Sequence, residues 1–415
     1  MKSYDSFREP SAAVAGNFRG QLLSTMSAPL FPGEALPARL LRYAVSLAAA
    51  AACVVLGVPL ACGRLAVALL RATRPPALSP QPQPPLPPSW RRSFLTVRDC
   101  RFQLTETGPP TAQQLVLLLH GFPQSAHCWR HVLGAFEGGG GGRARFVAVD
   151  LRGYGGSVPT AGAPPWPLTA FSMPSLVADV HALISSLGYS QVAIVAHDWG
   201  GMIAWSFAVA HPAMVSRLCV LAAPHPASFA PNCGWRQSLR SLYILLFQLP
   251  FLPELYIKFA AGASLDELFL GRSMGIRRRS LFGGRRALDA ADVAIFKGAV
   301  LSRAGALTHA LNYYRNLFGV NSFAAVGTPV QGRVSLLPMP VLQIWAANDG
   351  ALGTELTQGT DRLCANYRLV VLEDCSHWIA EDAASEAVQL IADFLSLPVD
   401  SAVQEQGEAG HTVAV

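Results

Sequence analysis

The chain has 415 residues, a length that suits one large enzyme core with attachments. Hydrophobic residues make up 51% of it, which indicates a segment in lipid or an unusually large core. The net charge of +6 comes from scattered arginines, and the eight cysteines show no CxxC or framework spacing, so nucleic-acid binding, zinc sites and disulfide-stapled folds are disfavoured.

The N-terminal part predicts a disordered leader at residues 1–37 and a transmembrane anchor at residues 38–64. Residues 43–63 are uncharged and mostly apolar, and they lie between Arg42 and Arg64. About 20 such residues span a bilayer as a helix. The apolar region of a cleaved signal peptide would be shorter and nearer the N-terminus, and a buried helix would not need charges at both borders. We expect a single-pass protein of the endoplasmic reticulum, with the cytosolic side slightly favoured for the catalytic part by arginines after the span.

A proline-rich linker is predicted at residues 65–92, because eight prolines fall between positions 75 and 88. Such a segment forms neither helix nor sheet and acts as a stiff, extended spacer. We therefore expect the catalytic core to begin near residue 93.

Short apolar runs alternate with helical patterns over the rest of the chain, and this alternation predicts an α/β fold with a mostly parallel sheet covered on both faces. The expected strands are residues 115–119, 146–149, 192–196, 218–221 and 341–345. The glycine run 138–142 predicts a flexible surface insertion. The core is expected at 93–227 and 329–398, with a helical cap domain inserted at 228–328 and a flexible tail at 399–415.

The most informative stretch is residues 192–201, where an apolar strand runs into His-Asp-Trp and two glycines. Small residues on both sides of a central side chain are typical of a nucleophile elbow, a turn too tight for bulky neighbours. The central position holds Asp198 in place of serine. A carboxylate is already ionised at neutral pH and can displace a leaving group from an sp³ carbon, forming an alkyl-enzyme ester. An aspartate that only caps the following helix is the other interpretation, but capping does not require glycines beyond it.

This stretch resembles the α/β-hydrolase-fold epoxide hydrolases, particularly their membrane-anchored subfamily, and the resemblance covers roughly residues 93–398. The residues Leu-His-Gly-Phe-Pro at 119–123 match the family's HGxP turn. The resemblance implies that the backbone N–H groups of Phe122 and Trp199 form an oxyanion hole facing the carboxyl group of Asp198. It also places His120, Pro123, Trp199 and Trp378 at the substrate pocket, although the motif position of His120 reads equally as a supporting one. The Asp150–Ser157 turn matches the family's DLRGYGxS segment and reads as structural.

The remaining triad members follow from two further family motifs. His377, in Ser-His-Trp at 376–378, matches the family's base, which activates water for hydrolysis of the ester. Asp349, in Trp-Ala-Ala-Asn-Asp at 345–349, matches the acid that orients this base, with Ala346 replacing the usual glycine. The chain order Asp198, Asp349, His377 is that of the hydrolase fold.

Two cap tyrosines separate an epoxide hydrolase from a haloalkane dehalogenase, which also uses an aspartate nucleophile. Opening an epoxide leaves an alkoxide, which needs O–H donors, whereas a halide is held by N–H donors. Tyr243 lies four residues before Phe-Gln-Leu-Pro, and Tyr314 lies in Asn-Tyr-Tyr-Arg-Asn; both match the family's segments. Either tyrosine alone would more often be a packing residue, but the pair favours epoxide hydrolysis.

The expected activity is conversion of lipophilic epoxides, such as those of fatty acids, to vicinal diols in lipid metabolism, with no metal or organic cofactor. The expected contacts are this small substrate and membrane lipid; the sequence identifies no protein partner. Two alternatives remain open here, a haloalkane-dehalogenase-like hydrolase and a non-catalytic hydrolase-fold binding protein. The arginine-rich cap insertion at 277–286 departs from ordinary cap composition and reads as a solvated loop or a contact with anionic lipid.

Overall fold

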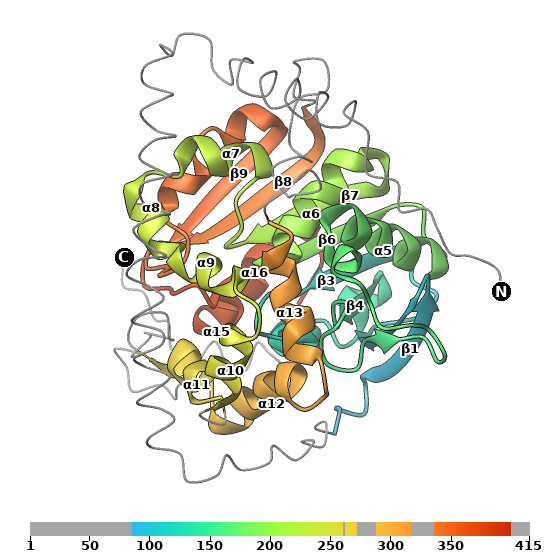
Figure 1. Ribbon diagram of the computed structural model, residues 1–415. Helices are drawn as coiled ribbons and strands as arrows, with labels where there is room; N and C mark the ends of the chain where they lie inside the picture. The colour runs from blue at the N-terminus through green and yellow to red at the C-terminus, as the bar shows by residue number, and fades with distance from the viewer. Residues whose placement is uncertain (1–84, 260–261, 272–287, 318–335, 400–415) are drawn as a thin grey trace, which may run out of the picture.

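The structure is a computed structural model that describes residues 85–259, 262–271, 288–317 and 336–399 (Figure 1). The predicted leader, membrane anchor, arginine-rich insertion and most of the linker and tail lie outside these residues. Within the described ranges, no helix is both long enough and apolar enough to cross a membrane.

A nine-stranded mixed sheet forms the core, with the order β1-β2-β4-β3-β6-β7-β8-β9 and β5 paired to β2. The pairs from β4 to β9 are parallel, as predicted, whereas β1, β2 and β5 add antiparallel pairing at one edge that the sequence patterns did not reveal. The strands are β1 Arg91–Val97, β2 Cys100–Thr107, β3 Gln114–Leu119, β4 Ala144–Val149, β5 Val158–Pro159, β6 Val192–His197, β7 Val215–Leu221, β8 Leu337–Ala346 and β9 Cys364–Leu372.

Helices cover both faces of the sheet because successive side chains of a strand point to opposite sides. In β3, Leu117 packs with α5 and α6, whereas Val116 packs with α3 and α16. The core helices are η1 Ala126–Trp129, α3 Arg130–Ala135, α4 Gly139–Gly142, η2 Leu168–Phe171, α5 Met173–Ser186, α6 Trp199–Ala210, η3 Pro212–Met214, η4 Thr354–Thr357, η5 Thr360–Leu363, α15 Ile379–Asp382 and α16 Ala384–Leu395.

The expectation of a flexible surface insertion at the glycine run is wrong for its first half. Gly139 and Gly140 are buried, and a Cβ on Gly139 would lie only 2.3 Å from the carbonyl oxygen of Ala144. The positive φ angles of this turn suit glycine and let the chain pass close to Ala144 and Leu397.

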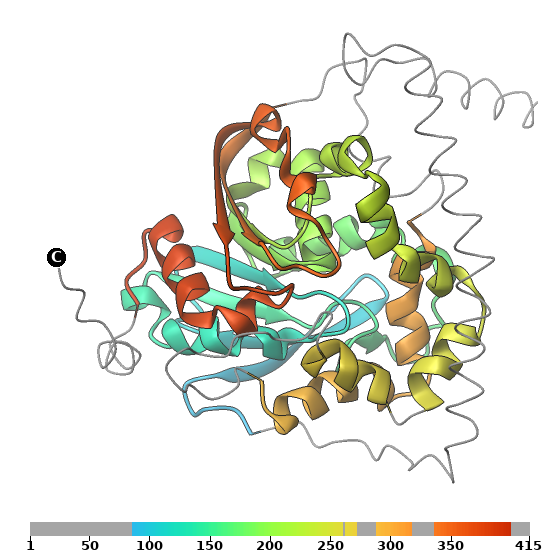
Figure 2. The ribbon, with the colours of Figure 1, turned by 90° about the vertical axis from the view of Figure 1, so that its left-hand side faces the viewer.

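Between β7 and β8 the chain leaves the sheet and forms a layer of helices (Figures 1 and 2). Figure 2 shows α9, α10, α12 and α13 beside the ends of the strands. The helices of this cap are α7 Pro226–Asn232, α8 Trp235–Arg240, α9 Leu242–Gln248, α10 Leu252–Phe259, α11 Ala263–Leu270, α12 Ala290–Leu301 and α13 Ala306–Arg315. The described part of the predicted cap thus forms helices, while the exact bounds of the cap stay a prediction.

Candidate active site

Asp198 stands on a sharp turn between β6 and α6. Its backbone has φ 50° and ψ −119°, a conformation that few non-glycine residues adopt and that costs on the order of 1–3 kcal/mol. The neighbouring glycines leave room for the turn. A Cβ on Gly200 would lie 2.3 Å from the carbonyl oxygen of Leu119, and one on Gly121 would lie 2.3 Å from the carboxylate of Asp198. The strain is therefore held by close packing, which leaves the Asp198 side chain 13% exposed.

Backbone donors surround the carboxylate of Asp198. The N–H of Phe122 donates to Oδ1 over 2.8 Å, and the N–H of Trp199 also bonds to this carboxylate. Burial alone would raise the pKa of Asp198, but His377 and these donors outweigh it and hold the pKa below its ordinary value. The carboxylate is therefore ionised and already lies in the predicted oxyanion hole.

His377 lies between two carboxylates. Its Nε2 is 3.6 Å from Oδ2 of Asp198, and its Nδ1 is 2.7 Å from Oδ2 of Asp349. The other oxygen of Asp349 accepts the N–H groups of Ala351 and Leu352, each over 2.8 Å, so this carboxylate is fixed in the loop after β8. The structure thus brings together the three residues that the sequence predicted as a triad.

The charge of His377 follows from these neighbours. Burial lowers the pKa of its imidazole, but the Asp349 and Asp198 carboxylates outweigh burial and raise the pKa to about 10. In the resting site His377 is therefore an imidazolium held between two carboxylates.

The two predicted tyrosines lie over the nucleophile on different cap helices, α9 and α13. Their rings are 5.9 Å apart, and the Tyr314 ring packs edge-on at 5.0 Å from Trp199 and 5.2 Å from Phe122. Burial, with the charge of Asp198 adding to it, raises the pKa of both phenols above the ordinary value. Both hydroxyl groups therefore stay protonated and can donate hydrogen bonds.

Arg315, which the sequence motifs did not single out, joins the two helices that carry these tyrosines. From α13 its guanidinium donates to the carbonyl oxygens of Phe247 and Leu249 at 3.1 and 2.9 Å, and it pairs with Glu254 at 2.9 Å. The sequence signal that could have identified Arg315 is its position directly after Tyr314. Its bonds to Phe247 and Leu249 fix the end of α9 against α13, which carries Tyr314.

The other residues predicted at the substrate pocket have mixed surroundings. Both ring nitrogens of His120 are bonded to backbone groups, Nδ1 to Gly121 and Nε2 to the N–H of Leu151. Trp378 is 1% exposed and packs on Phe269 and His377. Pro123 is buried and follows a cis peptide bond. A contact of these three residues with substrate stays a prediction. The two bonds of His120 hold the turn at residues 119–123.

His197, beside the nucleophile, is also a supporting residue. Its Nε2 lies 2.9 Å from the carbonyl oxygen of His377. Burial, with the nearby His377 charge, lowers the pKa of His197 to about 4, so its ring is neutral and donates its Nε2–H to that carbonyl. The bond ties the strand of the nucleophile to the loop of the base.

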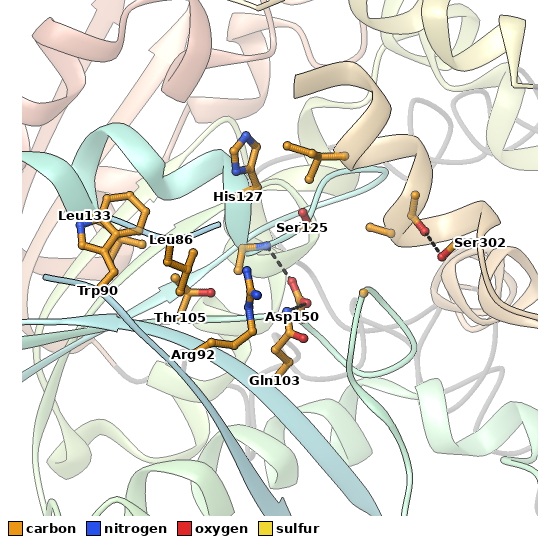
Figure 3. Close-up of a pocket in the computed structure, with 15 residues that line it drawn as sticks. Leu86, Trp90, Arg92, Gln103, Thr105, Ser125, His127, Leu133, Asp150 and Ser302 are labelled. Atoms are coloured by element: carbon orange, nitrogen blue, oxygen red, sulfur yellow. Dashed lines mark hydrogen bonds between the residues drawn. The ribbon is translucent and has the colours of Figure 1, made fainter. Parts of the chain in front are cut away.

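Within the described residues no group of three or more His, Cys, Asp or Glu side chains is arranged so that it could hold a metal ion. A cavity of about 130 Å³ lies away from Asp198, between β1, β2, η1 and α12 (Figure 3). Asp150 lines it and accepts the N–H of Ala126 at 2.9 Å, in keeping with the structural reading of its turn.

Comparison with known proteins identifies this arrangement. Residues 114–384 match the family described as the alpha/beta hydrolase fold. Over 310 residues the chain is 36% identical to epoxide hydrolase 3 of Xenopus tropicalis, a span of 74% of this chain and 78% of the relative. The chain belongs to the epoxide hydrolase family.

Other members of the family agree in sequence and in structure. Epoxide hydrolase 4 of Mus musculus is 34% identical over 73% of this chain and 79% of its own length. A mutant epoxide hydrolase from Bacillus megaterium, solved with its product (R)-3-[1]naphthyloxy-propane-1,2-diol, is 26% identical with a TM-score of 0.61 and covers 73% of this chain and 100% of its own. Family membership thus rests on the core and the cap together.

Proposed function

We propose that this protein hydrolyses lipophilic epoxides to vicinal diols through an ester on Asp198. The observation that carries the proposal is the placement of an ionised Asp198 beneath two protonated tyrosines and beside the His377–Asp349 pair. A carboxylate nucleophile, O–H donors for an alkoxide and a histidine base for water are the groups that the two half-reactions need.

In the first half-reaction Tyr243 and Tyr314 hold the epoxide oxygen. Asp198 attacks a ring carbon, the carbon–oxygen bond breaks, and a tyrosine proton passes to the new alkoxide. The product is a 2-hydroxyalkyl ester of the Asp198 carboxyl group. The resulting tyrosinate regains its proton from the imidazolium of His377, directly or through water, which leaves His377 neutral.

In the second half-reaction neutral His377 takes a proton from water, and the hydroxide attacks the ester carbonyl of Asp198. The N–H groups of Phe122 and Trp199 stabilise the oxyanion that forms. Collapse of the tetrahedral intermediate breaks the ester bond, and the released alkoxide takes a proton from the Asp198 carboxyl group. The cycle ends with the diol, an ionised Asp198 and a charged His377, which is the resting state.

The substrate we propose is a lipophilic epoxide such as an epoxy fatty acid. Aromatic rings form the surroundings of the nucleophile, with Phe122 packed 5.7 Å from Phe247 and Tyr314 packed 5.0 Å from Phe247. Apolar walls of this kind favour an apolar substrate. The diol product carried by the Bacillus megaterium relative fits the same class.

We also propose that residues 38–64 anchor the protein in the endoplasmic reticulum membrane with the catalytic part on the cytosolic side. Support comes from the uncharged run at 43–63 with arginines at both borders. Extraction of membranes with alkaline carbonate should leave the full chain in the pellet and release a variant that lacks residues 1–64. Protection of residues 90–399 from protease in sealed microsomes would contradict the cytosolic orientation.

A single turnover in ¹⁸O-labelled water tests the chemistry. The full chain in detergent is mixed in excess with an epoxy fatty acid, and the diol is analysed by mass. Unlabelled oxygen in the first diol is expected, because that oxygen comes from Asp198. Labelled diol would mean direct attack by water. Absence of diol, with halide released from a haloalkane, would favour the dehalogenase reaction instead.

A further inference from the structure

Glu381 is a buried carboxylate that the proposed chemistry does not use, four residues beyond His377. It is 1% exposed and belongs to α15. Its Oε1 accepts from Nη1 of Arg130 at 3.1 Å, and its Oε2 lies 2.7 Å from Nη2 of the same arginine. Nε2 of Gln124 also donates to Oε1 over 3.3 Å. Burial of a carboxylate is unfavourable unless partners compensate it, so these contacts hold Glu381 in place.

The contact between Gln124 and Glu381 joins two loops that carry groups of the active site. Gln124 closes the oxyanion turn, residues 120–124, through a 2.9 Å bond from its N–H to the carbonyl oxygen of Gly121, and Phe122 donates to Asp198 from the same turn. Glu381 continues the base loop, residues 374–378, which Asp382 holds by accepting the N–H of Ser376 at 2.8 Å. Glu381 therefore contacts Gln124 of the oxyanion turn from α15, the helix that directly follows the base loop.

We propose that Glu381, with Arg130 and Gln124, forms a bridge that fixes the distance between the oxyanion turn and the base loop, and is a positioning residue for hydrolysis of the ester. This inference rests on the proposed function. Ester hydrolysis needs the Phe122 N–H and the His377 ring to act on one carbonyl and one water at the same time. Ring opening needs Asp198 and the tyrosines, and His377 serves it only afterwards, as the acid that returns a proton to the tyrosinate.

Arg130 also contacts the cap, which supplies an internal comparison. Its Nη2 lies 3.1 Å from Oδ2 of Asp292 at the start of α12, and the other oxygen of Asp292 bonds to His127 at 2.7 Å. A cavity of about 130 Å³ lies beside these contacts, and His127 and Ile295 of α12 are among the residues that line it. Figure 3 shows His127 at this cavity. Asp292 therefore seats the cap, whereas Glu381 joins two loops of the core.

The test measures the two half-reactions separately in Glu381→Gln. The full chain in detergent is mixed with excess epoxide and quenched in time, and the intact mass gives the fraction of alkyl-enzyme. We expect hydrolysis of the ester to slow by between about 10-fold and 100-fold while its formation changes by less than about threefold, because small displacements penalise proton transfer most. Alkyl-enzyme should then accumulate at steady state. Burial raises the pKa of Glu381 to about 7 despite Arg130, so the measurements belong above that pH.

Two control variants separate the bridge from other effects. Glu106→Gln removes a carboxylate of similar burial that pairs with Arg145 on β4, and it should leave the partition between the two steps unchanged. Asp292→Asn keeps the Arg130–Glu381 pair and should not accumulate ester. If Glu381→Gln does not fold, the double variant Arg130→Gln/Glu381→Gln removes both buried charges and should show the same accumulation.

Several outcomes would overturn the bridge. Equal slowing of both half-reactions in Glu381→Gln would make the contact a general packing interaction. Equal ester accumulation in Asp292→Asn would mean that the slow hydrolysis comes from a displaced cap and not from the loss of the bridge. A wild-type chain that forms no diol at all would instead refute the proposed function, and the two failures are therefore distinguishable.

Discussion

Replacing Asp198 by asparagine should lower the pKa of His377 from about 10 toward neutrality. The amide keeps the shape of the side chain but removes its charge, as formation of the ester does. A unit charge 3.6 Å away contributes about 5 kcal/mol at an effective dielectric constant of about 20. Since about 1.4 kcal/mol corresponds to one pKa unit, loss of this charge is large enough to bring His377 into the range of a useful base. Ester formation would thus itself switch His377 from acid to base.

An NMR titration of the His377 ring in the wild-type chain and in Asp198→Asn measures this change.

The pH dependence of the free energy of unfolding supplies a second measurement. Because the folded pKa of His377 is raised above the ordinary 6.5, its contribution is complete below 6.5 and is lost as the pH rises through about 10. The free energy of unfolding should therefore fall over this range in the wild type and fall less in the variant. The same titration midpoint for His377 in both proteins would refute the reasoning.

Three further predictions concern the tyrosines, the elbow and the core. Tyr243→Phe and Tyr314→Phe should each slow ester formation by at least about tenfold in single-turnover assays, because each removes one donor to the alkoxide, and the rate of ester hydrolysis should hardly change. Gly121→Ala should abolish diol formation and lower Tm, since the new Cβ would lie 2.3 Å from the Asp198 carboxylate; an active variant would contradict the packing of the elbow. Ile391→Ala, in the buried face of α16, should cost about 2–5 kcal/mol in denaturant unfolding while kcat persists.

Sequence patterns predicted the parallel part of the sheet because those strands are buried on both faces and read as continuous apolar runs. The edge strand β1 and its neighbour β2 lack such a signal, since β1 has the mixed composition Arg-Arg-Ser-Phe-Leu-Thr-Val and pairs with β2 in the antiparallel direction. β9 gives a weaker sequence signal than the central strands, because several of its side chains are exposed.

The triad and the tyrosines could be predicted because each stands in a short local motif. The contacts of Arg315 with Glu254 and of Glu381 with Gln124 could not, since these partners lie 61 and 257 positions apart and depend on how the cap and the loops fold back. Local sequence identifies the groups that react, whereas long-range contacts decide how those groups are held.

In the proposed mechanism, the chain supplies the nucleophile before the cap insertion, the acid and base after it, and the alkoxide donors from within it. The core thus holds every group that hydrolyses the ester, while the cap supplies the donors that stabilise the leaving group when the ester forms. Exchange of the cap between family members is then a route to new leaving-group chemistry without alteration of the triad. A grafted cap would need an acidic residue opposite Arg130, as Asp292 provides, because that contact seats the cap on the core.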